Sequence, residues 1–177
     1  MKKISVILAI IFIFVIISGG CANNSRVEGE LIRIHVRAHS DLASDQDVKL
    51  AVKQNVVEHL TPILENQTDF DEAIERVRAE IPALEKIANN TLRQSGKDYG
   101  ASVKLTREFF PARAYENIVV ESGVYDALII ELGEAEGANW WCVIYPPLCF
   151  VNADDYGSSF SYKSKILELW QKYLSPS

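Results

Sequence analysis

Apolar and polar residues in the first half of the chain follow a strand pattern and then a helix pattern. The side chains of residues 31–39 alternate between apolar and polar, which predicts a half-buried strand. Apolar residues then recur at helical spacing after Ser44 and Asp47, which form a capping-box pattern. Pro62 is predicted to end or bend this helix.

A second helical pattern begins with Thr68 or Asp69 as its cap and stops at Gly96. Its apolar stripe stays in phase across Pro82. The unbroken phase favours a kinked helix, or two helices end to end, over a return to strand.

The second half of the chain is rich in residues that favour strands. Strands are predicted over residues 103–110, 124–132 and 139–145, with a short strand or an ordered connection within 113–120. The polar turn between Gly133 and Gly137 suggests that the last two strands pair as a hairpin. A polar loop, 151–161, and an amphipathic helix, 166–173, follow. This order predicts an α+β fold, a mostly antiparallel sheet with helices packed on one face.

The first 20 residues have the pattern of an export signal. Lys2 and Lys3 precede an uncharged stretch, residues 4–17, in which every residue but Ser5 is apolar, and small residues follow. A bilayer-spanning helix needs about 20 apolar residues, so a cleaved signal peptide is favoured over an uncleaved N-terminal anchor. We therefore expect a signal segment at 1–20, a flexible tail at 21–30 and a single α+β domain at 31–174.

Cys21 directly follows the small residues of the signal segment. This arrangement is similar to the lipidation box of bacterial lipoproteins, although Ser18 stands where that box carries a large aliphatic residue. Cys21 is either a lipidated N-terminus or an ordinary residue of the tail.

The charge balance argues against nucleic acid as a partner. The chain has a formal charge of −6, and loss of Lys2 and Lys3 with the signal would take it to −8. Phosphate binding needs a basic surface. A protein or peptidoglycan partner remains compatible with an acidic domain.

The histidines do not form a convincing metal site. His35 and His39 lie four positions apart on a predicted strand, which separates them by roughly 13 Å. His59 lies on a predicted helix and has no acidic residue at a spacing that would indicate a shared metal ion. We expect neither a metal nor a cofactor.

Cys142 and Cys149 flank a double proline and are either a disulfide or two packed thiols. An exported cysteine hydrolase would need one of them as a thiolate beside a histidine. Neither cysteine precedes a helix signal, and a disulfide would exclude both as nucleophiles.

Residues 139–150 are the most unusual segment of the chain. Trp140 and Trp141 are adjacent, so on a strand they face opposite sides of the sheet. Either both are core residues, or one is exposed and belongs to a binding surface, where tryptophan is enriched. Pro146 and Pro147 would give this segment a rigid corner suited to presentation.

Two stretches resemble the stage II sporulation protein R family. Residues 32–41 read I-R-I-H-V-R-A-H-S-D, close to the family's usual I-R-L-H-V-I-A-N-S-D, with His39 in place of asparagine. Residues 139–150 match its most specific motif, N-W-W-C-V-x-x-P-P-L-C-F. Residues between them also match the family: Phe110, Pro111, Arg113, Tyr115, Gly123 and Tyr125. The resemblance spans residues 31–174.

The resemblance implies a signalling role in an endospore-forming bacterium. Members are made in the forespore and exported into the space between the forespore and mother-cell membranes. There they activate a membrane-embedded aspartic protease, the sigma-E factor processing peptidase, which removes the pro-sequence of sigma-E. On this interpretation the chain is a ligand and not an enzyme, and it meets the membrane only through its signal segment or a lipid.

The expected contact with the protease is the tryptophan segment, with part of the first strand as a second candidate. The candidate residues are Asn139, Trp140, Trp141, Pro146, Pro147, Phe150, Arg33, His35 and Arg37. An exported cysteine-dependent cell-wall hydrolase and a structural envelope protein are the alternative functions.

Overall fold

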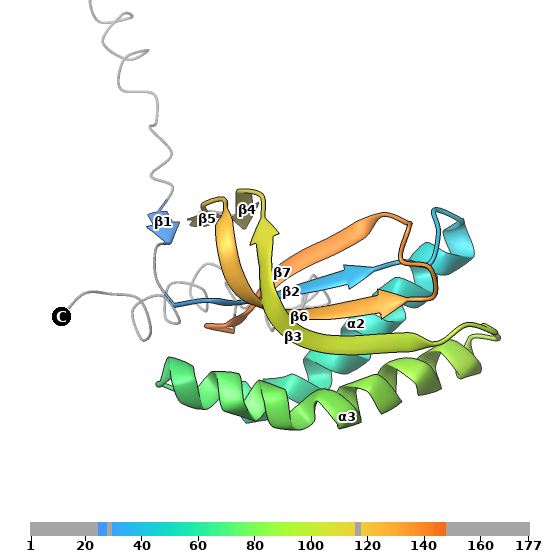
Figure 1. Ribbon diagram of the computed structural model, residues 1–177, viewed down its shortest axis with the longest axis horizontal. Helices are drawn as coiled ribbons and strands as arrows, with labels where there is room; N and C mark the ends of the chain where they lie inside the picture. The colour runs from blue at the N-terminus through green and yellow to red at the C-terminus, as the bar shows by residue number, and fades with distance from the viewer. Residues whose placement is uncertain (1–24, 28–29, 116–117, 148–177) are drawn as a thin grey trace, which may run out of the picture.

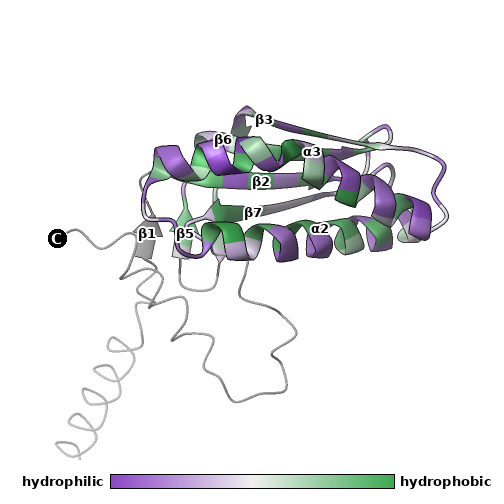
Figure 2. Ribbon diagram, turned by 90° about the horizontal axis from the view of Figure 1, so that it is seen from below, coloured by the Kyte–Doolittle hydropathy of each residue, from purple (hydrophilic) through white to green (hydrophobic). Residues whose placement is uncertain are grey.

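Two long helices lie side by side across one face of a sheet of four strands (Figures 1 and 2). The computed structural model describes residues 25–27, 30–115 and 118–147. The helices are α2 (Ala43–Leu64) and α3 (Phe70–Gln94). The strands, in their spatial order, are β3 (Ala101–Phe110), β6 (Gly123–Leu132), β2 (Ile32–Arg37) and β7 (Asn139–Tyr145). The predicted α+β fold is confirmed.

The predicted hairpin between the last two strands is wrong, because β2 lies between β6 and β7. It runs parallel to β6 and antiparallel to β7. The remaining pair, β3 with β6, is antiparallel, so two of the three strand pairs are antiparallel and the sheet is mixed. As a central strand, β2 is buried on both faces and not half-buried, and even Arg33 and His35 are inaccessible to water.

The first helix begins differently from the sequence prediction. Its N-cap is Leu42, which makes no side-chain capping bond, and the Ser44–Asp47 pattern lies inside the helix. The predicted capping box is therefore wrong. α2 continues past Pro62 to Leu64, because proline near the end of a helix removes few backbone bonds.

The second helix agrees more closely with its sequence signals. The side chain of Asp69 accepts the backbone N–H of Glu72 at 2.8 Å, so Asp69 is the predicted cap. Pro82 lies within one continuous helix. Gly96, at φ 73°, ends it, and the backbone N–H of Lys97 donates to the Leu92 carbonyl.

The core fills the space between the helices and the sheet. It consists of alternate residues of the strands and the inner stripes of the helices, as the amphipathic patterns predict. Its members include Ile32, Ile34, Val36, Val52, Val56, Leu60, Val77, Leu84, Leu92, Leu128, Ile130 and Leu132.

A second, smaller sheet lies on the side of the main sheet away from the helices (Figure 1). Its order is β1 (Ser25–Val27), β5 (Ile118–Val120) and β4 (Arg113–Tyr115). The predicted strand or connection within 113–120 is thus two short strands. β1 belongs to the segment predicted as a tail.

Several predicted features lie outside the described residues. They are the signal segment 1–20, Cys21, Cys149, Phe150, the loop 151–161 and the helix 166–173. Within the described ranges, no helix is both long and apolar enough to cross a bilayer.

A buried carboxylate joins the start of α2 to the connection between α3 and β3. Asp45 is 3% exposed and accepts hydrogen bonds from Lys97 and Tyr99, each at 2.7 Å, and from the hydroxyl of Ser40. These bonds, from Lys97 first and then from Ser40 and Tyr99, hold the pKa of Asp45 well below its ordinary value of 3.8. Burial opposes this shift only in part.

We expect Asp45→Asn to lower the free energy of unfolding at pH 7 and to make stability less dependent on acid. The folded-state pKa of Asp45 lies below the unfolded one, so its contribution is complete above about pH 4 and is lost as the pH falls further. Urea unfolding between pH 7 and pH 3 measures the difference between the two proteins. Asp47→Asn, at an exposed position of the same helix, is the control. A difference that stays constant with pH would contradict this account.

Candidate interaction face

The strands of the main sheet present a largely polar set of side chains on the face away from α2 and α3. Because side chains alternate along a strand, every second residue points to this face. The residues of this face used below are Arg33, His35 and Arg37 of β2, Lys104, Glu108 and Phe110 of β3, Glu131 of β6, and Asn139 and Trp141 of β7, and Ala127 and Ile129 of β6 pack among them. We call this set the polar face.

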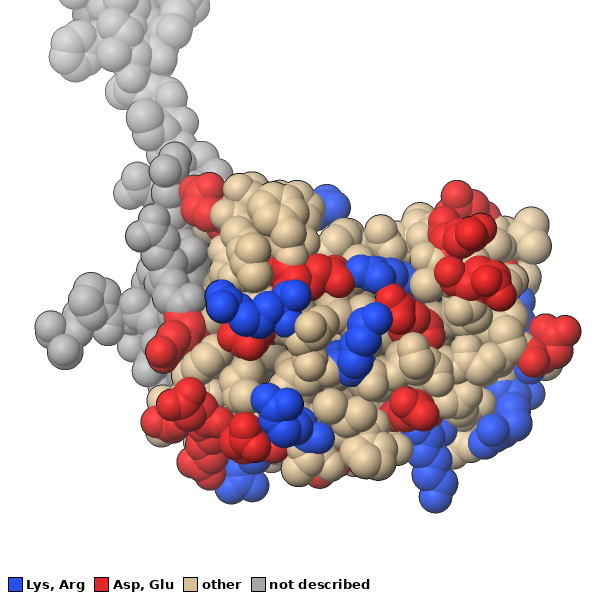
Figure 3. All heavy atoms as spheres, viewed as in Figure 1, with Lys and Arg blue, Asp and Glu red and all other residues tan. Residues whose placement is uncertain are grey.

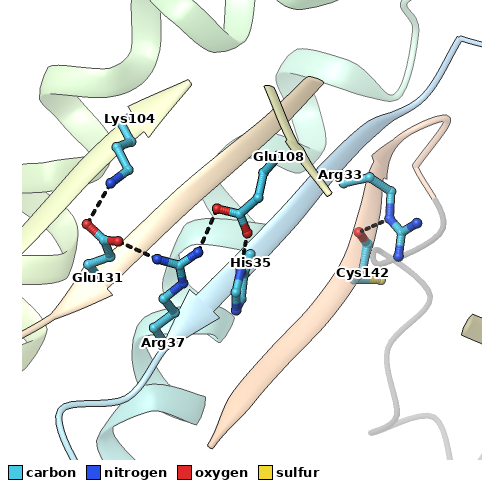
Figure 4. A network of polar contacts seen from close by, with 7 residues as sticks. All are labelled: Arg33, His35, Arg37, Lys104, Glu108, Glu131 and Cys142. Carbon is cyan, nitrogen blue, oxygen red and sulfur yellow. Dashed lines mark hydrogen bonds and ion pairs between the residues drawn. The ribbon is translucent and has the colours of Figure 1, made fainter. Parts of the chain in front are cut away.

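A chain of charged groups crosses three strands of the polar face (Figure 4). Lys104 binds Glu131 at 2.8 Å, and Arg37 binds Glu131 and Glu108, each at 2.6 Å. Glu108 in turn lies 2.8 Å from Nδ1 of His35. The hydrogen bond from Lys104 is the largest cause that lowers the pKa of Glu131, and Arg37 adds to it. The network fixes the positions of the side chains on this face.

His35 is an almost fully buried imidazole, 2% exposed, in contact with two aromatic rings. It stacks on Trp141 with ring centroids 3.6 Å apart and meets Phe110 edge-on. Burial lowers the pKa of His35, against the effects of Glu108 and Asn139, so the ring is neutral at pH 7. Since the carboxylate of Glu108 can only accept, Nδ1 carries the proton and Nε2 is an acceptor. Nε2 has no hydrogen-bond partner.

Arg33 is fully buried and links the two sheets. Its guanidinium donates to the Cys142 carbonyl and to the Tyr115 hydroxyl of β4, each at 3.1 Å. It also lies 4.5 Å from the ring centre of Phe110 and 5.2 Å from that of Tyr125. Burial lowers the pKa of Arg33. Arg33 therefore has a structural role, and none of its surface is exposed for contact with a partner.

An open hollow of about 540 Å³ lies at one end of the polar face. Side chains of the polar face, the neighbouring Phe109 and the loop between β6 and β7 line it. Its lining residues are His35, Arg37, Glu108, Phe109, Ala135, Glu136, Gly137, Asn139 and Trp141. The loop can pass close to the end of β2 because residue 137 is a glycine. A Cβ at Gly137 would lie 2.2 Å from the Ser40 carbonyl oxygen, too close for any other residue.

The structure divides the predicted contact segment between the two faces of the sheet. Trp140 packs on the helix-side core, with Nζ of Lys53 over its ring, whereas Trp141 is half-buried on the polar face. Asn139 is exposed, but Pro146 and Pro147 are buried. Asn139 and Trp141, with Arg37 and His35 beside them, thus lie together on the polar face, whereas the prolines and Arg33 are buried.

Cys142 faces the helix-side core, 6% exposed, and is disulfide-bonded. Its predicted partner Cys149 lies outside the described residues, so that pairing stays a prediction. His35 points to the opposite face of the sheet and cannot reach the Cys142 sulfur. The other two histidines make contacts elsewhere in the fold: His39 stacks on Tyr99, and His59 contacts Glu80 at 2.6 Å.

Glu108, Glu131 and Lys104 belong to the site and were not predicted from the sequence. Alternation along residues 103–110 places Lys104 and Glu108 on one face, but only the strand order brings this face within reach of β2, across β6. Among the described residues, no group of three or more His, Cys, Asp and Glu side chains could hold a metal ion. On the face seen in Figure 3, acidic and basic side chains are interleaved, without a broad basic area among the described residues.

Comparison with known proteins agrees with the sequence motifs. Residues 28–155 match the family described as stage II sporulation protein R. The stage II sporulation protein R of Bacillus subtilis (strain 168) is 33% identical over 165 residues, which cover 86% of this chain and 73% of the relative. No solved structure matches the chain.

Proposed function

Because this chain belongs to the stage II sporulation protein R family, we propose that it is an exported sporulation signal that activates a membrane-embedded protease. The protease is the sigma-E factor processing peptidase of the mother cell, and the product of activation is sigma-E without its pro-sequence. The chain acts as a ligand of the protease and not as an enzyme. It is made in the forespore and crosses the forespore membrane into the intermembrane space.

The observation that carries the proposal is the polar face, where the family's most specific motif places Asn139 and Trp141 at the surface. Tryptophan beside a fixed polar network is a common centre of protein interfaces. The network from Lys104 to His35 holds this surface in one conformation before binding, which reduces the entropy lost on association.

The position of Cys142 argues against the cysteine hydrolase. Its sulfur is buried and disulfide-bonded, and the imidazole of His35 lies across the sheet from it. A thiolate nucleophile needs a base within hydrogen-bond distance. No feature of the described residues favours a structural envelope protein over a signalling protein.

Activation needs different affinities for two states of the protease. A ligand shifts a conformational equilibrium only by the difference between its binding free energies for the two states. We propose that the polar face binds the active state of the protease more tightly at a region outside the membrane. The signal segment, or a lipid on Cys21, supplies the only membrane contact of the chain.

Co-expression in non-sporulating cells tests the proposal. This chain, the processing peptidase and pro-sigma-E are produced together, each is omitted in turn, and cleavage is followed on a blot. We expect cleavage only when all three are present. We also expect it to persist, at equal amounts of folded protein, when Cys142 and Cys149 are both replaced by serine. Absence of cleavage with all three proteins made and this one exported would contradict the signalling role, and loss with the serine variant would favour the hydrolase.

A further inference from the structure

The charged side chains that line the hollow beside Trp141 are Arg37, Glu108 and Glu136, one positive and two negative, so the lining has a formal net charge of −1. Arg37 is its positively charged lining residue, and both terminal nitrogens of Arg37 are engaged, one with Glu108 and one with Glu131. The two oxygens of Glu108 are engaged with Arg37 and His35. The charges of Arg37 and Glu108 therefore compensate one another, and Glu136 carries the uncompensated negative charge of the lining.

Glu136 is the lining carboxylate that remains available. It is exposed, and among the described residues its carboxylate has no hydrogen bond or ion pair. Its backbone N–H donates to the carbonyl of His39 at 3.3 Å, and that of Gly137 donates to the carbonyl of Ala38 at 3.0 Å. The loop therefore holds the backbone of Glu136 beside the hollow, within reach of its carboxylate.

The second acceptor is Nε2 of His35, which is buried and makes no hydrogen bond in this conformation, although the Asn139 side chain is close enough to act on the ring and raise its pKa. A buried acceptor without a hydrogen bond costs free energy. A donor that reached Nε2 would therefore stabilise the complex more than the same hydrogen bond would at an exposed atom. The exposed side chain of Asn139 lies beside this ring on the neighbouring strand and lines the same hollow. Rotation of that side chain would admit a donor.

We propose that the hollow binds one cationic side chain of the protein partner, a lysine or an arginine, with Glu136 and Nε2 of His35 as its acceptors. The inference rests on the proposed function for the source of that side chain. An anion is disfavoured because the only guanidinium of the hollow is already paired and Glu136 would repel it. The aromatic ring of Trp141 can cover the aliphatic part of such a side chain.

A titration of the full-length protein with single amino-acid probes tests the site without the protease. The probes are Nα-acetyl-arginine N-methylamide and, with the opposite charge, Nα-acetyl-glutamate N-methylamide. The indole N–H of Trp141 and Nε2 of His35 are followed by NMR. We expect the arginine probe to shift both signals with a Kd on the order of 1–10 mM, as one side chain binds weakly, and the glutamate probe to shift neither.

Two loop variants identify the acceptor. Glu136→Gln removes the charge at the hollow and should weaken binding of the arginine probe about fivefold. Glu134→Gln, in the same loop but outside the lining, is the matched control and should bind as the unchanged protein does. The proposal would be overturned if the protein preferred the glutamate probe or bound neither probe. It would also be overturned if the two variants weakened binding equally.

The same variants in the co-expression assay separate this inference from the proposed function. Reduced cleavage with Glu136→Gln but not with Glu134→Gln supports both. Binding of the arginine probe without any cleavage by the unchanged protein leaves the cation site in place and contradicts the signalling role. Full cleavage with Glu136→Gln shows that the partner does not use this hollow and overturns the inference alone.

Discussion

Trp141→Ala is expected to reduce pro-sigma-E cleavage in the co-expression assay by more than about tenfold, the loss typical of a central interface tryptophan. The substitution removes the ring that stacks on His35 and forms one wall of the hollow. It also removes half-buried apolar surface, so a decrease of about 2 kcal/mol in the free energy of unfolding should accompany it. Cleavage is therefore compared at equal amounts of folded protein.

Trp140→Ala is the matched control for this experiment. Trp140 is the same residue type on the same strand, equally half-buried, but it packs on the helix side. We expect a similar loss of stability and little loss of cleavage. Trp141→Phe keeps an aromatic ring at the polar face and should retain part of the activity. If the two alanine variants lost cleavage to the same extent, the polar face would not be the contact surface.

The second large effect is expected from Arg33→Ala, which should lower the free energy of unfolding by about 3 kcal/mol. The variant leaves a cavity beside Phe110 and Tyr125 and removes the hydrogen bonds from Arg33 to Cys142 and Tyr115. The hydrogen bond that joins β4 to β2 is lost with them. Denaturant unfolding measures this change.

Arg33→Met separates packing from charge in the same position. Methionine fills most of the volume, and it removes a buried cation whose Nη1 has no hydrogen-bond partner. In the variant the hydroxyl of Tyr115 can still donate to the Trp141 carbonyl, which lies 3.4 Å away. We expect Arg33→Met to cost less than about 1 kcal/mol. A cost equal to that of Arg33→Ala would show that the guanidinium hydrogen bonds, and not the volume, stabilise this link.

Local features of the fold could be predicted because their signals lie within a few residues. The cap at Asp69, the stop at Gly96 and the three long strands of the second half all depend on neighbours in the sequence. The capping box at Ser44 failed because Asp45, between its two residues, is engaged by Ser40, Lys97 and Tyr99. Two of those three partners are more than 50 positions away.

The sequence by itself determined the α+β class, the alternation that separates the two faces of each strand, and the family. It also placed Trp140 and Trp141 on opposite faces, because successive side chains of any strand diverge. Which face is which, and which charges meet there, depended on the tertiary structure. Arg37 and Glu131 lie 94 positions apart and meet only because β2 enters the sheet between β6 and β7. No local pattern specifies that pairing, since a strand's own residues fix its faces and not its neighbours.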